Sequence, residues 1–293
     1  MLSVRAPVVQ RLLPVALLLV AMCSIQTGAS LAQQLFPMVG ASGATSIRLL
    51  LAAALMLVIF RPWRQPLTRR AWKAIAVYGV AMGMMNFLLY QALATVPLGI
   101  AVALEFTGPL AVAVCTSRRR RDLAWIALAI AGLAILLWPD KSIEQGIDLR
   151  GALCALGAGV CWALYILFGR RAGSGNGPQS AALGITIAAI VMAPIGLIEA
   201  GTAIFSSAVL PVGLVIAVLS TALPYTLEMF SLARMPTNMF GTLMSLEPAI
   251  GALSGLIFLG QQLTVLQWLA IGTIITASMG TTLTSRLAAP VQD

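Results

Sequence analysis

Long apolar segments separated by short polar ones recur along the whole chain of 293 residues. Segments of roughly 20 residues have the length of an α-helix that crosses the hydrocarbon core of a membrane. A membrane β-barrel would instead show shorter segments in which apolar and polar residues alternate. The pattern predicts an all-α membrane protein of about ten transmembrane helices, at residues 12–32, 39–60, 74–94, 98–116, 122–138, 151–169, 179–199, 209–232, 238–259 and 264–284.

The composition also indicates a chain that faces lipid, because 60% of its residues are hydrophobic and only 9% are charged. Its net charge of +9 would suggest nucleic-acid binding in a soluble protein. The arginines, however, lie in short loops between apolar segments, where positive charge sets the orientation of membrane proteins. We therefore expect a membrane-lipid environment and no nucleic-acid partner.

The basic residues gather in alternate loops. If the N-terminus is cytoplasmic, fifteen of the eighteen lysines and arginines lie on the cytoplasmic side. Lys141 and Arg150 then fall outside, and Arg48 lies within the second predicted helix. This asymmetry predicts a multi-pass inner-membrane protein with both termini in the cytoplasm. The run Arg118–Arg121 is interpreted as part of this topology signal, with binding of anionic lipid as the alternative.

The first apolar segment resembles a cleavable signal peptide, but it is longer than a usual signal core. Its polar residues Ser24, Gln26 and Thr27 are expected to form one face of a helix that is retained in the bundle.

Two prolines twelve residues apart occur in each half of the chain. Pro97 and Pro109 align with Pro236 and Pro248 at one offset of 139 positions. Because five helices is an odd number, two consecutive five-helix units have opposite orientations in the membrane. We predict two inverted five-helix repeats, at residues 12–138 and 151–284, which is the symmetry typical of alternating-access transporters.

The chain contains no histidine, the commonest general base and a common metal ligand. Its four cysteines lie within apolar segments and form no metal-binding or disulfide pattern. We expect neither a metal site nor a cofactor, so any proton chemistry falls to carboxyl groups.

Three charged residues lie near the centres of predicted helices: Arg48, Glu105 and Glu247. A central charge costs about 2.5 to 3.5 kcal/mol on insertion scales, so these residues should pair or line a wet cavity. In the functional interpretation, a glutamate, foremost Glu105, exchanges protons and Arg48 binds a substrate carboxylate. In the structural alternative, Arg48 forms an ion pair with Glu105 or Glu247. Glu228 lies nearer the cytoplasmic end of its helix and is expected to pair with Arg234.

Polar and aromatic residues of the same helices are candidates for the rest of the pathway: Asn86, Tyr90, Trp162, Tyr165 and Tyr225. Trp162 and Tyr165 are three positions apart and so share a helical face. Ordinary packing within a bundle explains such residues equally well, and the pattern leaves both readings open. Prolines and glycines beside Glu105 and Glu247 predict kinks that free backbone carbonyls.

Three segments resemble a known family: TVPLGIAVALEFTGPLAVAV from Thr95, LSTALPYTLEM from Leu219 and FGTLMSLEPA from Phe240. With them the chain resembles the EamA-type transporters of the drug/metabolite transporter superfamily over nearly its whole length. The resemblance, most specific around Glu105, implies proton-driven export of threonine, homoserine and similar small neutral amino acids. Other members of the superfamily move drugs or aromatic metabolites, so a broad exporter of such compounds is the alternative.

Two other functional classes fit the residues less well. Membrane-embedded hydrolases and transferases commonly need histidine or intramembrane aspartate, so we expect the protein not to be an enzyme. A passive channel is compatible with the helices but would ignore the proton gradient.

Overall fold

The computed structural model describes residues 8–64, 68–116, 122–136, 148–172, 177–232, 240 and 243–286. The described part is helical and contains no β-strand. The elements are α1 (Val8–Gln33), α2 (Phe36–Phe60), η1 (Pro62–Arg64), α3 (Arg69–Leu93), α4 (Leu98–Glu105), α5 (Thr107–Thr116), α6 (Asp122–Leu136), α7 (Leu149–Ala172), α8 (Gly177–Ala200), η2 (Gly201–Phe205), α9 (Val209–Ala217), η3 (Val218–Ala222), α10 (Leu223–Leu232), α12 (Glu247–Leu259) and α13 (Val265–Arg286).

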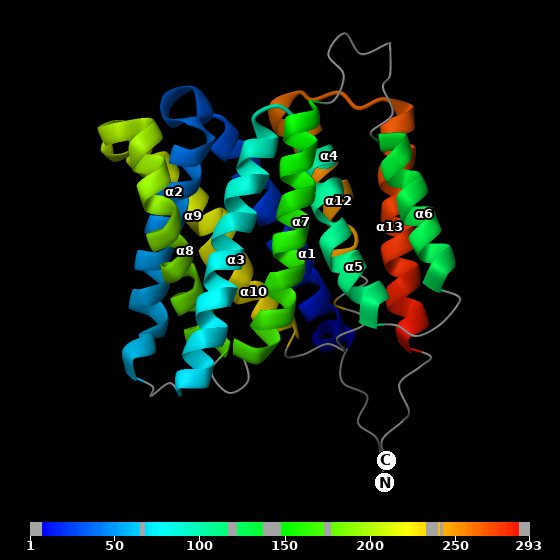
Figure 1. Ribbon diagram of the computed structural model, residues 1–293, viewed down its shortest axis with the longest axis horizontal. Helices are drawn as coiled ribbons and strands as arrows, with labels where there is room; N and C mark the ends of the chain where they lie inside the picture. Colours follow the sequence, from blue (N-terminus) through cyan, green and yellow to red (C-terminus); the bar gives the residue numbers. More distant parts are fainter. Residues whose placement is uncertain are drawn as a thin grey trace.

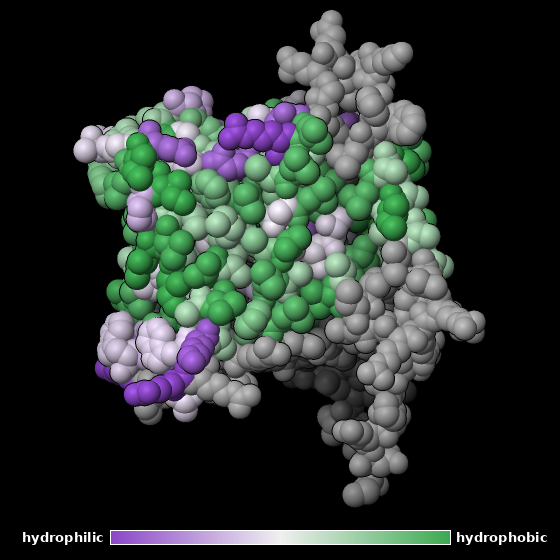
Figure 2. Space-filling view, in the orientation of Figure 1, coloured by the Kyte–Doolittle hydropathy of each residue, from purple (hydrophilic) through white to green (hydrophobic). Residues whose placement is uncertain are grey.

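The helices have the length and polarity of membrane spans. Within the described ranges, six segments are long and apolar enough to cross a membrane: Leu12–Gln33, Phe36–Arg64, Ala71–Leu93, Leu149–Gly169, Gln179–Phe205 and Val209–Glu228. Three shorter apolar helices cover Leu98–Val112, Glu247–Leu259 and Val265–Gly280. Figure 2 shows a broad apolar band on one face, with polar residues toward its two ends. The prediction of an all-helical membrane protein is confirmed, whereas the count of ten spans stays a prediction.

The helices stand side by side in one bundle, and α1 begins at the same end of it as α13 finishes (Figure 1). The most extensive helix contacts join the two halves of the chain. α2 packs along α8, α3 along α7, α1 along α10, α4 along α12 and α6 along α13. The interior is therefore built between the halves rather than within each of them.

Glycine permits the closest of these contacts. A Cβ atom at Gly99 of α4 would lie 2.5 Å from the Cα atom of Ala252 in α12. A Cβ atom at Gly108 of α5 would overlap the carbonyl oxygen of Gly159 in α7. Small residues of this kind let helix backbones approach closely in membranes. These contacts hold α4 and the start of α5 against the second half of the bundle.

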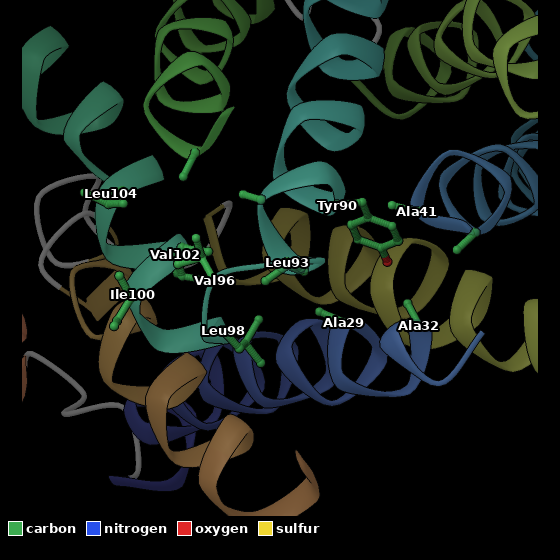
Figure 3. Close-up of a cluster of buried hydrophobic side chains, with 14 of the residues drawn as sticks. Ala29, Ala32, Ala41, Tyr90, Leu93, Val96, Leu98, Ile100, Val102 and Leu104 are labelled. Carbon is green, nitrogen blue, oxygen red and sulfur yellow. The ribbon is translucent and has the colours of Figure 1, made fainter. Parts of the chain in front are cut away.

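All eight residues of α4 are buried, including Glu105 at its C-terminal end. Its side chains Leu98, Ile100, Val102 and Leu104 belong to the largest buried apolar cluster, which also includes Tyr90 of α3 (Figure 3). The elements packed around α4 include α7 and α12. Glu105 is consequently held in the protein interior, away from lipid.

Several predicted helices are broken rather than continuous. The predicted helix 98–116 divides at Phe106 into α4 and α5, so that Glu105 ends the first piece. In the predicted helix 238–259, residues 245–246 form a turn and Glu247 begins α12. Pro248 in the first turn suits a helix start, because proline has no N–H group to leave unpaired there. Both glutamates therefore lie at helix breaks, as the nearby prolines and glycines suggested.

A third interruption lies in the predicted helix 209–232, where η3 is a π-helical turn. Pro224 has no N–H group for the usual bond to the carbonyl of Ser220 and crowds that carbonyl. The N–H group of Leu223 instead bonds to the carbonyl oxygen of Val218, five residues back. The extra residue in this turn places Ser220 and Thr221 as buried polar side chains in the bundle.

Candidate functional site

The three charged residues predicted at helix centres are all buried. The exposed fraction is 5% for Arg48, 5% for Glu105 and 6% for Glu247. They come from α2, α4 and α12, and Glu105 lies close enough to both of the others to interact with them electrostatically. The structure thus gathers these three residues into one interior region, which we call the central charged site.

Arg48 is fixed by neutral partners. Its Nη2 atom donates a hydrogen bond to Oδ1 of Asn86, and Nδ2 of Asn86 donates to the carbonyl oxygen of Met82 at 2.8 Å. The guanidinium carbon lies 4.8 Å from the ring centre of Tyr90. Asn86 and Tyr90, both predicted pathway residues, are one helical turn apart on α3 and so hold Arg48 from one side.

The guanidinium retains unused binding capacity. Among the described residues, Arg48 forms no ion pair with Glu105 or Glu247, and its buried Nε atom has no hydrogen-bond partner. The structural alternative of a direct ion pair is therefore not present in this arrangement. A buried N–H donor without a partner is costly, and an anionic ligand would satisfy it.

Glu247 has a partner that the sequence did not single out. Nε2 of Gln26 in α1 donates to Oε1 of Glu247 at 3.3 Å. The remaining oxygens of this pair, Oε2 of Glu247 and Oε1 of Gln26, have no partner within the described part of the chain. From the sequence, Gln26 is expected only to form part of one polar face of a bundled helix. The sequence did contain one signal for such a role, since Gln26 is an uncharged polar residue inside an apolar segment.

The helix break beside Glu105 packs against α7. A Cβ atom at Gly159 would lie 2.6 Å from the carbonyl oxygen of Glu105, so α7 touches the end of α4 directly. One turn further along α7, the ring of Trp162 meets the ring of Phe106 edge-on, with centroids 5.6 Å apart. Trp162 therefore lies beside the central charged site, and its role in the pathway stays a prediction.

Tyr165 and Tyr225 lie in a second group, nearer the end of the bundle where α1 begins. The ring of Tyr165 stacks on that of Tyr78, with centroids 4.8 Å apart. Tyr165 also interacts with Tyr225, and Glu228 interacts electrostatically with all three tyrosines. Although Trp162 and Tyr165 share a face of α7, they belong to different groups. Tyr78 is a member that the sequence did not suggest.

The predicted partner of Glu228, Arg234, lies outside the described residues. The position of Glu228 among tyrosines suits a cation, because aromatic rings and a carboxylate both attract positive charge. No group of three or more histidine, cysteine, aspartate or glutamate residues in the described ranges is placed to hold a metal ion.

Taken together, the central charged site offers an unpaired donor on Arg48 and unpaired acceptors on Glu247 and Gln26. A zwitterionic ligand has the complementary groups, an anionic carboxylate and a cationic ammonium group. Charged groups placed at helix breaks near the middle of a bundle are typical of substrate sites in secondary transporters. The geometry therefore suits binding of a small zwitterion inside the membrane.

The fold and the sequence both resemble those of known proteins. A crystal structure of another protein, 18% identical, matches with a TM-score of 0.52 over 94% of this chain and 99% of that chain, which supports the fold. The model of the EamA-like transporter family matches residues 149–283.

Among curated proteins, the threonine/homoserine exporter RhtA of Escherichia coli K12 is 53% identical over 281 residues, covering 96% of this chain and 95% of its own. The exporter of the same name from Salmonella typhimurium LT2 is 55% identical over 274 residues, with 94% and 92% covered. These relatives are transporters rather than enzymes, and they confirm the resemblance found in the sequence motifs. The chain belongs to the EamA-like transporter family.

Proposed function

We propose that this protein exports threonine, homoserine and similar small neutral amino acids across the inner membrane. The observation that carries the proposal is the 53% identity to a threonine/homoserine exporter over 96% of the chain. The central charged site supports it, since its unpaired donor and acceptors match the carboxylate and ammonium groups that all such substrates share.

In this proposal Arg48 receives the substrate carboxylate. Asn86 and Tyr90 already fix the guanidinium in the interior, so little side-chain freedom remains to be lost on binding. The planar guanidinium offers hydrogen bonds in a fork that matches a carboxylate. Its Nε–H group is the donor that is free for this contact.

Proton antiport follows from competition for a carboxylate. A deprotonated Glu105 attracts the substrate ammonium group, whereas a protonated Glu105 does not. A proton entering from the outer side would therefore displace the substrate to the outside. The transporter would then return to its inward-facing state with the proton but without substrate, and would release the proton to the cytoplasm. Glu247 lies within electrostatic range of Glu105 and takes part in the same competition.

Alternating access is proposed to rest on two inverted repeats, residues 12–138 and 151–284. The pattern of helix packing supports this, because it is unchanged when the halves are exchanged. α2–α8, α4–α12 and α6–α13 each join helices of equivalent rank in the two halves. Exchanging the halves turns the α1–α10 pair into the α3–α7 pair, because α1 and α7 are the first helices of the two halves and α3 and α10 belong to the third. Helix breaks beside Glu105 and Glu247, in helices of equivalent rank, add further support.

We also propose that both termini face the cytoplasm. The distribution of lysine and arginine supports this orientation, with fifteen of eighteen on that side. The group formed by Tyr78, Tyr165, Tyr225 and Glu228 would then occupy the cytoplasmic half of the path.

The test is uptake of labelled threonine and homoserine into vesicles with inverted orientation that contain the purified protein, with and without an imposed proton gradient. Native protein should accumulate both amino acids only when the gradient is present. Glu105→Gln should lose this accumulation and should also exchange labelled for unlabelled threonine more slowly, because the neutral amide, like the protonated carboxyl, attracts the ammonium group less. Gradient-driven accumulation by Glu105→Gln would remove Glu105 from the coupling step.

The second candidate is a broad exporter of drugs or aromatic metabolites, favoured by the aromatic rings of Tyr78 and Tyr165. It would be preferred if neither threonine nor homoserine accumulated while a flat aromatic cation did. In that case Glu228 would be the carboxylate that attracts the ligand.

A further inference from the structure

Gln26 occupies the junction of three helices in the middle of the bundle. It belongs to α1, its amide contacts Glu247 of α12, and only 2% of its surface is exposed. A Cβ atom at Gly251 would lie 3.3 Å from Oε1 of Gln26 and 3.4 Å from Cγ2 of Val102 in α4. The Gln26 amide is therefore buried against α12, on the side of α12 that also faces Val102 of α4, beside the central charged site.

The amide is only half satisfied. Its nitrogen donates to Glu247 at 3.3 Å, but its oxygen has no hydrogen-bond partner among the described residues. A buried acceptor left without a donor is unfavourable, because nothing replaces the hydrogen bond that it would make with water. The described residues hold eight buried side-chain atoms without a hydrogen-bond partner, and this one lies next to the carboxylate of Glu247, where a ligand can supply the missing donor.

Different groups of the site match different parts of an amino acid. The carboxylate is an acceptor and is matched by the free N–H group of Arg48. The ammonium group is cationic and is matched by the carboxylates of Glu105 and Glu247. Two neutral groups of the site also lack a partner, the hydroxyl of Tyr90 and the amide oxygen of Gln26. Of these, the amide oxygen can only accept, so it suits a neutral donor. A side-chain hydroxyl is the neutral donor that threonine and homoserine share.

We propose that Oε1 of Gln26 accepts a hydrogen bond from the side-chain hydroxyl of the substrate and thereby selects hydroxylated amino acids over methyl isosteres. This inference rests on the proposed function. Oε1 of Gln26 lies against the backbone of Gly251, where a Cβ atom would come within 3.3 Å of it. Because glutamine rotates about three side-chain bonds, a small rotation lets this one acceptor meet a hydroxyl on either the first or the second side-chain carbon.

The selectivity depends on whether the bound ligand gives the Gln26 oxygen a hydrogen-bond donor. Valine has the shape of threonine with a methyl group in place of the hydroxyl, and norvaline stands in the same relation to homoserine. Either isostere would bury the Gln26 oxygen without a donor, and a site built to bond a hydroxyl rejects such ligands strongly. If the Gln26 amide is removed, a bound isostere no longer leaves an oxygen unpaired, and the preference for hydroxylated substrates is lost.

The experiment measures initial uptake rates in proteoliposomes of the full chain for both pairs, threonine with valine and homoserine with norvaline. Native protein should prefer the hydroxylated member of each pair. Gln26→Leu should lower both preference ratios at least tenfold, with valine and norvaline transported no more slowly than by native protein. Gln26→Met, which keeps the length of the side chain, should lower both preference ratios in the same way. It provides the test if the leucine variant does not fold.

Gln91→Leu is the matched control. Gln91 is also a glutamine within the bundle, but its Nε2 atom donates to Oγ of Ser42 at 2.8 Å, away from Glu247. This variant should leave both preference ratios unchanged, whatever its effect on overall rate.

Two results would overturn the inference while leaving amino-acid export intact. One is a folded Gln26 variant with unchanged preference ratios. The other is an equal loss for all four substrates, which would mean that Gln26 only positions Glu247. If native protein transported none of the four, the proposed export function itself would fail.

Discussion

The guanidinium carbon of Arg48 lies 4.8 Å from the ring centre of Tyr90, so a buried cation is held against an aromatic face. A desolvated contact of this kind contributes about 2 kcal/mol, and it keeps the guanidinium in one place without consuming its charge. Arg48 thereby stays available to a ligand carboxylate even though it is packed in the interior.

Tyr90→Leu should weaken threonine transport because it removes the ring that holds Arg48. We expect the half-saturating concentration to rise about tenfold, which corresponds to about 1.4 kcal/mol. Tyr90→Phe keeps the ring and should stay within about twofold of native protein. Concentration dependence of uptake in proteoliposomes measures both. Equal effects of the two variants would assign the role to the hydroxyl rather than to the ring.

Arg48→Lys should not rescue transport, although it preserves the charge. The ammonium group cannot bond to Asn86 and still present a second, coplanar donor to a carboxylate. We expect at least a tenfold loss of threonine uptake, as for Arg48→Gln. Near-native uptake by the lysine variant would show that charge alone suffices.

Gly108→Val should destabilise the protein, because its side chain would overlap the backbone of Gly159 across the α5–α7 contact. Overpacking of this kind costs about 1 to 3 kcal/mol of unfolding free energy. Gly272→Ala is the control, since a Cβ atom there meets nothing within 4 Å. Unfolding in mixed micelles should show that the alanine variant is no less stable than native protein. Equal stability of Gly108→Val would contradict the close packing.

Asp148 should contribute a pH-dependent part of the stability. Oδ2 of Asp148 accepts hydrogen bonds from Oγ1 of Thr95 at 2.8 Å and from the N–H group of Gly151 at 2.9 Å. These two bonds, the Thr95 bond first, hold the pKa of Asp148 below its usual value of 3.8. The stabilisation is therefore fully present above that value and is lost as the pH falls through the lowered pKa of the folded state.

Asp148→Ala should accordingly lower the melting temperature at pH 7, and the difference from native protein should shrink as the pH falls below 3.8. Thr95→Val, which removes one of the two bonds, should show a smaller difference with the same pH trend. Melting curves in detergent at several pH values measure this. A difference independent of pH would place the effect outside the ionised carboxylate.

Arg64 and Arg150 are exposed at opposite ends of the bundle and permit a direct test of orientation. In a variant without its native cysteines, Arg150→Cys should react with a membrane-impermeant thiol reagent added outside intact cells. Arg64→Cys should react only after the membrane is opened. The reverse pattern would invert the proposed topology.

The positions of the helices could be predicted from sequence because lipid imposes a simple rule on length and polarity. Burial of Arg48, Glu105 and Glu247 followed from the same rule, since each charge is costly against lipid. These features depend on the local sequence and the solvent alone. The family resemblance required only the motifs around Glu105, Glu228 and Glu247.

The contacts of the site depended on information that local patterns do not contain. Gln26 meets Glu247 across 221 positions of sequence, and nothing near either residue specifies the other. Trp162 and Tyr165 share a helical face, yet the rise along α7 brings them to different neighbours, Phe106 and Tyr78. Periodicity gives the direction of a side chain around its helix but not the identity of the residue it meets.

The pairing of each helix with one from the other half also bears on how the protein is made. The first five helices enter the membrane before any of their main neighbours has been synthesised, since α1, α2, α3, α4 and α6 pack along later helices. During that interval Gln26 lacks its partner Glu247, and Glu105 lacks the packing of α7 and α12 that buries it. Assembly of the bundle must therefore be completed by the second half of the chain, and the nascent first half is the species most exposed to membrane quality control.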